Sequence, residues 1–208
     1  MAGKVIALAQ QKGGSGKTTI AANLAVAFLQ RGASVALLDT DPQGSLGRWF
    51  MARRATAGTE RLEFSTSSAW GVSYECEKLK RDADFVIIDT PPKVDADLRP
   101  ALREADLILV PVASSHVDLW ATEGVLDLAQ REKKQAWLVM NRTRAGTRLG
   151  TDVARAAGGM SAGVMVAELA NRVVYAESLG QGRGALEAPR GLAGAEVSAL
   201  ADEILRLL

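Results

Sequence analysis

A glycine-rich segment between an apolar run and a helix-forming stretch constrains the fold of this chain more than any other feature. Residues 10–19 read Gln-Gln-Lys-Gly-Gly-Ser-Gly-Lys-Thr-Thr and follow the run Val-Ile-Ala-Leu-Ala at residues 5–9. Strand, glycine turn and helix in this order are typical of a phosphate-binding loop, because glycine lets backbone N–H groups close around phosphate oxygens and the helix N-terminus adds a positive dipole. The segment therefore predicts a nucleotide site, and a glycine turn without a ligand is the weaker interpretation.

The residues of this loop have separate expected roles. The side chain of Lys17 reaches the β- and γ-phosphates, and the Thr18 hydroxyl ligates Mg²⁺. The full set of expected nucleotide-binding residues in the loop is Gly13, Gly14, Ser15, Gly16, Lys17, Thr18 and Thr19.

One position departs from the ordinary loop pattern. Gln11 stands where the pattern has glycine, six residues before the lysine, and Lys12 follows it. A long cation at the mouth of the loop is not needed to bind the chain's own nucleotide. We therefore expect Lys12 to reach a nucleotide held by a second copy of the protein and to act in catalysis there.

The order of apolar runs and amphipathic stretches predicts the fold. Near-continuous apolar strands that alternate with helices indicate a parallel sheet covered on both faces. We expect an α/β fold of the P-loop NTPase class, with a twisted, mostly parallel sheet and one domain over residues 1–208. Strands are expected at residues 4–10, 34–38, 62–64, 85–88, 107–110, 136–140 and 164–166, and helices at 16–30, 46–54, 71–81, 95–104, 118–132, 147–157, 171–179 and 195–208. Pro111 is expected to end its strand.

Composition excludes several classes of protein. Apolar residues make up 48% of the chain, and 25 basic residues balance 24 acidic ones, so there is no global polyelectrolyte character. The single cysteine, Cys76, excludes an internal disulfide framework and a cysteine-based metal cluster. Without a signal peptide or an apolar run near ~18 residues, a soluble cytoplasmic protein is expected.

Three aspartates follow predicted strands at the edge where ligands of such sheets bind. Asp89 ends an apolar strand and fits the carboxylate that holds Mg²⁺ through a water. Asp39 and Asp41 alternate along an extended segment, so their side chains point to opposite sides. We assign Asp41 to the attacking water and Asp39 to the metal surroundings. The alternative for each of the three is that it only caps the following helix.

Asn141 also ends a strand on the nucleotide side and is a candidate to hydrogen-bond the purine edge. Residues 141–144 read Asn-Arg-Thr-Arg, so the guanine-selecting pattern Asn-Lys-x-Asp is absent. This absence favours adenine as the base.

Three motifs, taken together and in order, resemble those of the deviant Walker A ATPases of the ParA/MinD group. They are Lys-Gly-Gly-Ser-Gly-Lys-Thr-Thr at residues 12–19, Asp-Thr-Asp-Pro-Gln-Gly at 39–44, and Ile-Asp-Thr-Pro-Pro at 88–92. The stretch at residues 172–180 is similar to that family's late segment beside the nucleotide base.

The resemblance implies a function beyond what the residues show. ATP and Mg²⁺ are the expected cofactors, and Lys12 is expected to cross to the partner's phosphates in an ATP-sandwich homodimer. Such ATPases hydrolyse ATP weakly until a partner, here a ParB-like or cargo-adaptor protein, stimulates them. Members of the ParA type bind DNA without sequence preference and position a plasmid, a chromosome region or a protein cluster over the nucleoid.

Absences narrow the resemblance to the short ParA type. The phosphate loop begins near the N-terminus, which leaves no preceding specific DNA-binding domain. Residues 199–208 lack the cationic face of a membrane-docking helix, so no membrane partner is expected. An iron–sulfur relative needs paired cysteines, which Cys76 alone does not supply.

Non-specific DNA binding depends on arginines that lie close in sequence, although a merely solvated surface is an equal alternative. They are Arg142, Arg144, Arg148, Arg155, Arg172, Arg183 and Arg190. The partner protein is expected to touch residues 93–120. Two other functions stay open at this point: a nucleotide-binding regulatory scaffold that binds no DNA, and a small-molecule kinase or ligase with a monomeric active site.

Overall fold

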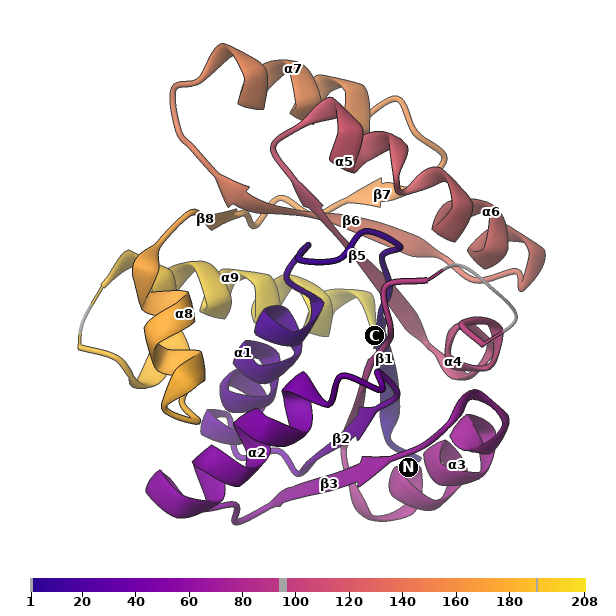
Figure 1. The fold of residues 1–208 in the computed structure, drawn as a ribbon, viewed down its shortest axis with the longest axis vertical. Coiled ribbons are helices and arrows are strands. Elements are labelled where there is room, and N and C mark those ends of the chain that lie inside the picture. The colour runs from indigo at the N-terminus through magenta and orange to yellow at the C-terminus, as the bar shows by residue number, and fades with distance from the viewer. Residues whose placement is uncertain (1, 94–96, 190) are drawn as a thin grey trace.

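A single parallel sheet organises the computed structural model, which describes residues 2–93, 97–189 and 191–208. The strands lie in the order β3-β2-β4-β1-β5-β6-β7, with β8 also paired to β6, and every pairing is parallel (Figure 1). Their bounds are β1 Lys4–Leu8, β2 Val35–Asp39, β3 Leu62–Thr66, β4 Phe85–Asp89, β5 Leu107–Ala113, β6 Ala136–Thr143, β7 Gly163–Val164 and β8 Leu169–Ala170. The α/β class expected from the apolar runs is confirmed.

Helices cover both faces of the sheet (Figure 1). One face carries α1 Lys17–Gln30, α2 Ser45–Thr56, α8 Val173–Gly180 and α9 Leu192–Leu207, together with the 3₁₀ turn η2 Ala185–Glu187. The other carries α3 Val72–Asp82, α4 Arg99–Glu104, α5 His116–Trp120, α6 Glu123–Arg131 and α7 Arg148–Ala157, and η1 Ala69–Gly71 precedes α3.

The central strand β1 shows why its sequence is apolar throughout. Ile6 and Leu8 point into the core under α1, whereas Val5 and Ala7 point into the core on the opposite face. Alternate side chains of a strand face opposite sides of the sheet, so a strand covered on both faces has no solvent-facing position for a polar residue.

Pro111 does not end β5, contrary to the expectation from sequence. The strand runs on to Ala113, and Pro111 pairs with Val139 of β6. The ladder between β5 and β1 stops at Leu109, so the missing N–H of Pro111 falls on the side where β5 has no further ladder partner. A proline is tolerated at such a position because no sheet hydrogen bond is lost.

Other predicted elements differ in their ends. The helix expected over 118–132 is divided into α5 and α6, and α7, α8 and the tail helix α9 are found close to their expected bounds. The helix expected over 95–104 is found as α4 from Arg99, because residues 97 and 98 form a turn; residues 94–96 lie outside the described part. The tail helix packs its apolar residues into the core, as expected: Val197, Leu200, Ala201 and Ile204 are buried.

Strand register brings the expected site residues to one edge. Leu8 of β1 is level with Asp89 of β4, and Asp89 is level with Asp39 of β2. The segments that follow these strands therefore meet beyond the carboxyl ends of the sheet. Within the described residues, no helix combines the length and apolar character needed to cross a membrane.

Candidate nucleotide-binding site

The glycines of the loop are required by its backbone. Gly14 and Gly16 have φ angles of 75° and 99°, in the left-handed region that other residues rarely adopt. A Cβ atom at Gly16 would also lie 2.2 Å from Nδ2 of Asn141. The first turn of α1 begins directly after it, at Lys17, so the loop passes into a helix N-terminus as the sequence predicts.

Gln10 fixes the loop to the sheet, a role that the sequence did not reveal. Its buried side chain donates from Nε2 to the carbonyl of Pro111 at 3.1 Å, and its Oε1 accepts the N–H of Gln11 at 2.8 Å. The carbonyl oxygen of Gln10 accepts from Nζ of Lys17 at 3.0 Å. Gln10 thus holds both the beginning of the loop and its phosphate-binding lysine.

Lys17 is a buried cation at the end of this loop. Burial lowers the pKa of its ammonium, whereas the carboxylates of Asp89 and Asp41 act in the opposite direction. A buried ammonium that faces carboxylates is stabilised further by a phosphate, because the anion replaces lost hydration.

Thr18 and Asp89 provide the oxygens that fit Mg²⁺. The Thr18 hydroxyl donates to Oδ2 of Asp89 at 2.6 Å, and Asp89 is almost fully buried. Burial raises the pKa of Asp89 to about 7, although the hydrogen bond from Thr18 opposes the rise. The other oxygen, Oδ1, is buried without a hydrogen-bond partner among the described residues. Such an oxygen is costly unless a cation or donor reaches it, and Mg²⁺ prefers oxygen ligands of this kind.

No group of three or more His, Cys, Asp or Glu side chains forms a metal cage in the described part of the chain. This agrees with the way Mg²⁺ is bound beside nucleotides. It keeps several waters and takes one or two protein oxygens along with the phosphates. The Thr18 hydroxyl and the Asp89 carboxylate are two oxygens of this kind.

The two aspartates after β2 have different surroundings. Asp39 is 3% exposed, and its two carboxylate oxygens accept backbone N–H groups of Asp41 at 3.0 Å and Gly47 at 3.1 Å. Burial raises the pKa of Asp39, and these hydrogen bonds oppose the rise. Asp41 is half-buried, and only its Oδ1 accepts a hydrogen bond from a described residue, the N–H of Gln43 at 2.9 Å.

The side chain of Asn141 contacts the phosphate loop. Its Nδ2 donates to the carbonyl of Ser15 at 2.7 Å, and its Oδ1 accepts the N–H of Arg142 at 2.9 Å. Both ends of this buried amide are used within the chain, so Asn141 braces the loop from β6 in addition to lying beside the expected base position.

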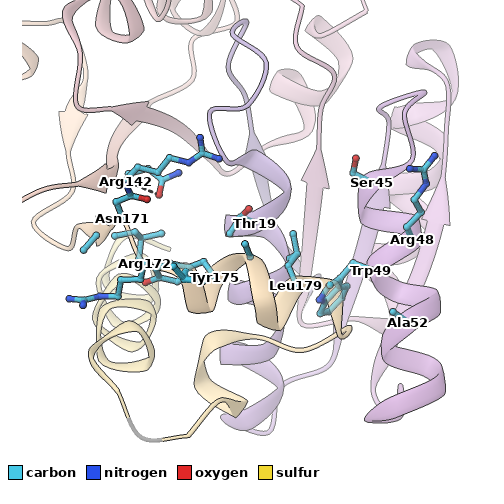
Figure 2. A pocket seen from close by; sticks show the side chains of 16 residues that line it. Thr19, Ser45, Arg48, Trp49, Ala52, Arg142, Asn171, Arg172, Tyr175 and Leu179 are labelled. Carbon is cyan, nitrogen blue, oxygen red and sulfur yellow. Dashed lines mark hydrogen bonds between the residues drawn. The ribbon is translucent and has the colours of Figure 1, made fainter.

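A cavity of about 790 Å³ adjoins the loop and lies between α2 and α8. Figure 2 shows Thr19 at its centre, Asn171 and Tyr175 on one side, and Arg48 and Trp49 on the other. This volume is within the usual range of ligand pockets, and the cavity lies next to the phosphate loop, so a nucleoside fits there. The exposed Asn171 was not a candidate from sequence, because nothing in its local pattern marks it.

Lys12 is held by an ion pair within the chain. Its Nζ lies 2.6 Å from Oδ1 of Asp118 on α5, and its side chain is 43% exposed. Burial acts to raise the pKa of Asp118, but its hydrogen bonds with Lys12 and Ser115 outweigh burial and hold that pKa below its usual value. No sequence pattern marks Asp118, which is 106 positions away from Lys12.

The structure groups only some of the arginines: Arg144 and Arg172 line one pocket with residues of α7, and Arg142 and Arg172 line the cavity beside the loop. Arg148 and Arg155 on α7 have side chains 97% and 75% exposed and share Asp152 as a partner. Arg172 forms an ion pair with Glu196 at 2.6 Å. Arg183 follows α8 in the chain, and α8 lies below α7 in Figure 1. Arg190 lies outside the described residues.

Comparisons with known proteins agree with this geometry. The sequence profile of the family described as ATPase MipZ matches residues 4–129. Maintenance of carboxysome distribution protein A from Halothiobacillus neapolitanus is 30% identical over 211 residues, which cover 98% of this chain and 94% of that protein.

Two solved structures are similar over nearly the whole chain. The ATP complex of a Cyanothece McdA variant has a TM-score of 0.81 at 16% identity and covers 99% of this chain and 96% of its own. The septum site-determining protein MinD from Pyrococcus horikoshii, complexed with Mg-ADP, has a TM-score of 0.81 at 19% identity, with 98% and 96% covered. At these identities the similarity concerns the fold, and it confirms the P-loop NTPase class.

Proposed function

Because this chain belongs to the ATPase MipZ family of ParA-like ATPases, we propose that it is a nucleotide-switched homodimer that positions a cargo over the nucleoid. Its cofactors are ATP and Mg²⁺, and family membership implies ATP hydrolysis. The observation that carries the proposal is the place of Lys12: its ammonium is paired with Asp118 on α5, is partly exposed, and is free to exchange that partner for a phosphate of a second copy.

The chain's own residues bind the triphosphate in a defined way. The backbone N–H groups of residues 13–19 and the ammonium of Lys17 contact the phosphates. Thr18 and Asp89 would hold Mg²⁺, which would supply positive charge beside the phosphates. Support comes from the unpartnered Oδ1 of Asp89 and its hydrogen bond with Thr18.

Asp41 holds the attacking water. Its carboxylate is half-buried, and Oδ2 has no hydrogen-bond partner among the described residues, so this oxygen is available to a water in line with the γ-phosphate. The hydrogen bond from Gln43 to Oδ1 keeps the side chain near the backbone turn. Asp41 thereby combines a local capping contact with the proposed catalytic one.

Asn141 and Asn171 divide the recognition of the nucleoside. Asn141 braces the loop at Ser15, and its position beside the cavity brings it near the base. The amide of Asn171 lines the same cavity and is exposed, so it is placed to read the purine edge. Adenine fits because its edge offers both a donor and an acceptor to one amide.

The closed dimer is proposed to bind DNA without sequence preference and to release it after hydrolysis stimulated by a ParB-like or cargo-adaptor protein. Arg148 and Arg155, both highly exposed, lie on α7 and are the proposed phosphate contacts. The name of the Halothiobacillus relative refers to carboxysome distribution, which supports a cargo that is a large intracellular body. In this cycle the protein is cytoplasmic and associates with the nucleoid in its ATP-bound state.

Co-sedimentation with non-specific DNA tests the DNA-binding part. We expect binding with ATP but not ADP, falling steeply with salt, and each arginine removed from α7 lowers the salt slope by about one. Arg183→Ala, on the surface after α8, is the matched control and should leave the slope unchanged. The absence of ATP-dependent, salt-sensitive binding would contradict the nucleoid cycle and favour the alternative, a regulatory scaffold that binds no DNA.

A further inference from the structure

Asp39 makes contacts that differ from those expected of a metal ligand. It is the last residue of β2 and is 3% exposed. Oδ1 accepts the N–H of Asp41 at 3.0 Å, and Oδ2 accepts the N–H of Gly47 at 3.1 Å. The carboxylate therefore joins the beginning of the segment 40–47 to its end.

The second contact performs a task that the helix lacks locally. The N-cap of α2 is Gly44, which has no side chain to accept one of the free N–H groups of the first turn. Oδ2 of Asp39 accepts the N–H of Gly47 in that turn instead. A negative charge here also faces the positive end of the helix dipole. Asp39 thus caps α2 from the preceding strand.

The segment between these contacts is anchored at its base as well. The N–H and hydroxyl of Thr40 both donate to the carbonyl of Asp89, at 2.9 and 3.0 Å. Ser67 donates its N–H to the carbonyl of Asp39 at 3.2 Å. With the base fixed to β4 and β3, the conformation of residues 41–46 depends on the carboxylate of Asp39.

We propose that Asp39 is a positioning residue, whose carboxylate fixes the segment 40–47 and thereby the place of the Asp41 carboxylate, without binding Mg²⁺. The inference rests on the proposed role of Asp41. The nearby Asp89 has the free oxygen that a metal requires, whereas each oxygen of Asp39 already faces a backbone donor.

The test compares Asp39→Asn with Asp41→Ala and the unmodified protein. The Asn amide group turns an N–H₂ toward one of the two backbone donors, so one charge-assisted hydrogen bond is lost. We expect kcat to fall about tenfold, as the loss of one such bond implies. The KM for ATP and the Mg²⁺ concentration for half-maximal rate should stay within about twofold, since the phosphate and metal contacts are intact.

Amide hydrogen exchange in the unmodified protein and in Asp39→Asn gives a second readout. In the unmodified protein the amides of Asp41 and Gly47 should be protected, and in Asp39→Asn at least one of them should exchange faster while the amides of β4 do not change. If the amides of Asp41 and Gly47 in the unmodified protein exchange at the rate of an unstructured peptide, the inference is wrong, whatever the exchange rates in the variant are.

The outcomes distinguish a failure of the catalytic role proposed for Asp41 from a failure of the positioning role proposed for Asp39. If Asp41→Ala keeps its ATP turnover, the proposed function of Asp41 is wrong. If Asp41→Ala loses turnover but Asp39→Asn keeps its kcat, only the positioning role is wrong. A large rise in the Mg²⁺ requirement of Asp39→Asn overturns the positioning role in favour of a metal role.

Discussion

The ammonium of Lys12 lies 2.6 Å from the carboxylate of Asp118, so the lysine expected to act on a second copy is bound within its own chain. The pair is only partly buried, with the Lys12 side chain 43% exposed. Ion pairs at exposed positions contribute about 0–1 kcal/mol. A triphosphate offers Lys12 a stronger partner, so the contact is one that dimerisation can replace.

Replacing Asp118 with Asn should favour the dimer. The neutral amide keeps a side chain of the same size on α5 but releases Lys12, so the protein concentration needed for half-maximal ATP-dependent dimerisation should fall by about two- to fivefold, the range that an exposed ion pair implies. Sedimentation velocity over a concentration series measures the change.

The control for Asp118→Asn is Asp152→Asn on α7, a more exposed carboxylate that pairs with Arg148 and Arg155. That variant should dimerise like the unmodified protein. If Asp118→Asn dimerises as the unmodified protein does, or more weakly, the ion pair between Lys12 and Asp118 does not oppose formation of the ATP-bound dimer.

The two asparagines beside the cavity should affect nucleotide binding differently. Asn141→Ala removes the hydrogen bond to Ser15 in the loop, so ATP and GTP should both bind more weakly, by about 1–2 kcal/mol. Asn171→Ala leaves the loop intact and should chiefly reduce the preference for ATP over GTP. Fluorescence titration with both nucleotides separates the cases, and a selective loss of ATP binding in Asn141→Ala would assign base reading to that residue instead.

Arg53 lies on α2, which forms one wall of the cavity, and we expect its side chain to stabilise that wall. Its guanidinium forms two hydrogen bonds with Glu187, at 2.9 and 3.0 Å, and a third with the carbonyl of Gly182. Since the side chains of Arg53 and Glu187 are only 8% and 21% exposed, Arg53→Ala leaves a carboxylate without its main partner. We expect the free energy of unfolding to fall by about 2–3 kcal/mol.

Urea denaturation measures that loss, with the exposed neighbour Arg54→Ala as the control. Arg54→Ala should change the free energy of unfolding by less than about 0.5 kcal/mol. If Arg53→Ala and Arg54→Ala lower the free energy of unfolding equally, the contacts of Arg53 with the turn after α8 do not contribute to stability.

Local patterns in the sequence were enough for much of the fold and of the phosphate site. The apolar runs of β1, β2 and β4 place their polar successors at one edge by the geometry of a parallel sheet, so the loop, Asp39 and Asp89 could be grouped without coordinates. The loop glycines likewise predicted a tightly curled backbone, and Gly14 and Gly16 adopt positive φ angles in it.

Contacts between distant segments were beyond sequence reasoning. The partner of Lys12 is 106 positions away, and Arg53 meets Glu187 across 134 positions, with no periodic pattern that links either pair. Pro111 was misjudged because its tolerance in β5 depends on where the neighbouring ladder with β1 ends. The two-residue strand β8 is too short to show alternation.

In the proposed homodimer, Lys12 of each subunit completes the active site of the other subunit. Subunit complementation tests it: Lys12→Ala and Asp41→Ala, each expected to hydrolyse ATP poorly alone, are mixed in equal amounts before ATP is added. In a mixed dimer, the site of the Lys12→Ala subunit has its own Asp41 and receives Lys12 from the other subunit. We expect recovery to about a quarter of the unmodified rate, because half of the dimers are mixed and each mixed dimer has one complete site of its two. No recovery above the sum of the two separate variants would contradict it, because a lysine that serves its own nucleotide leaves neither site complete.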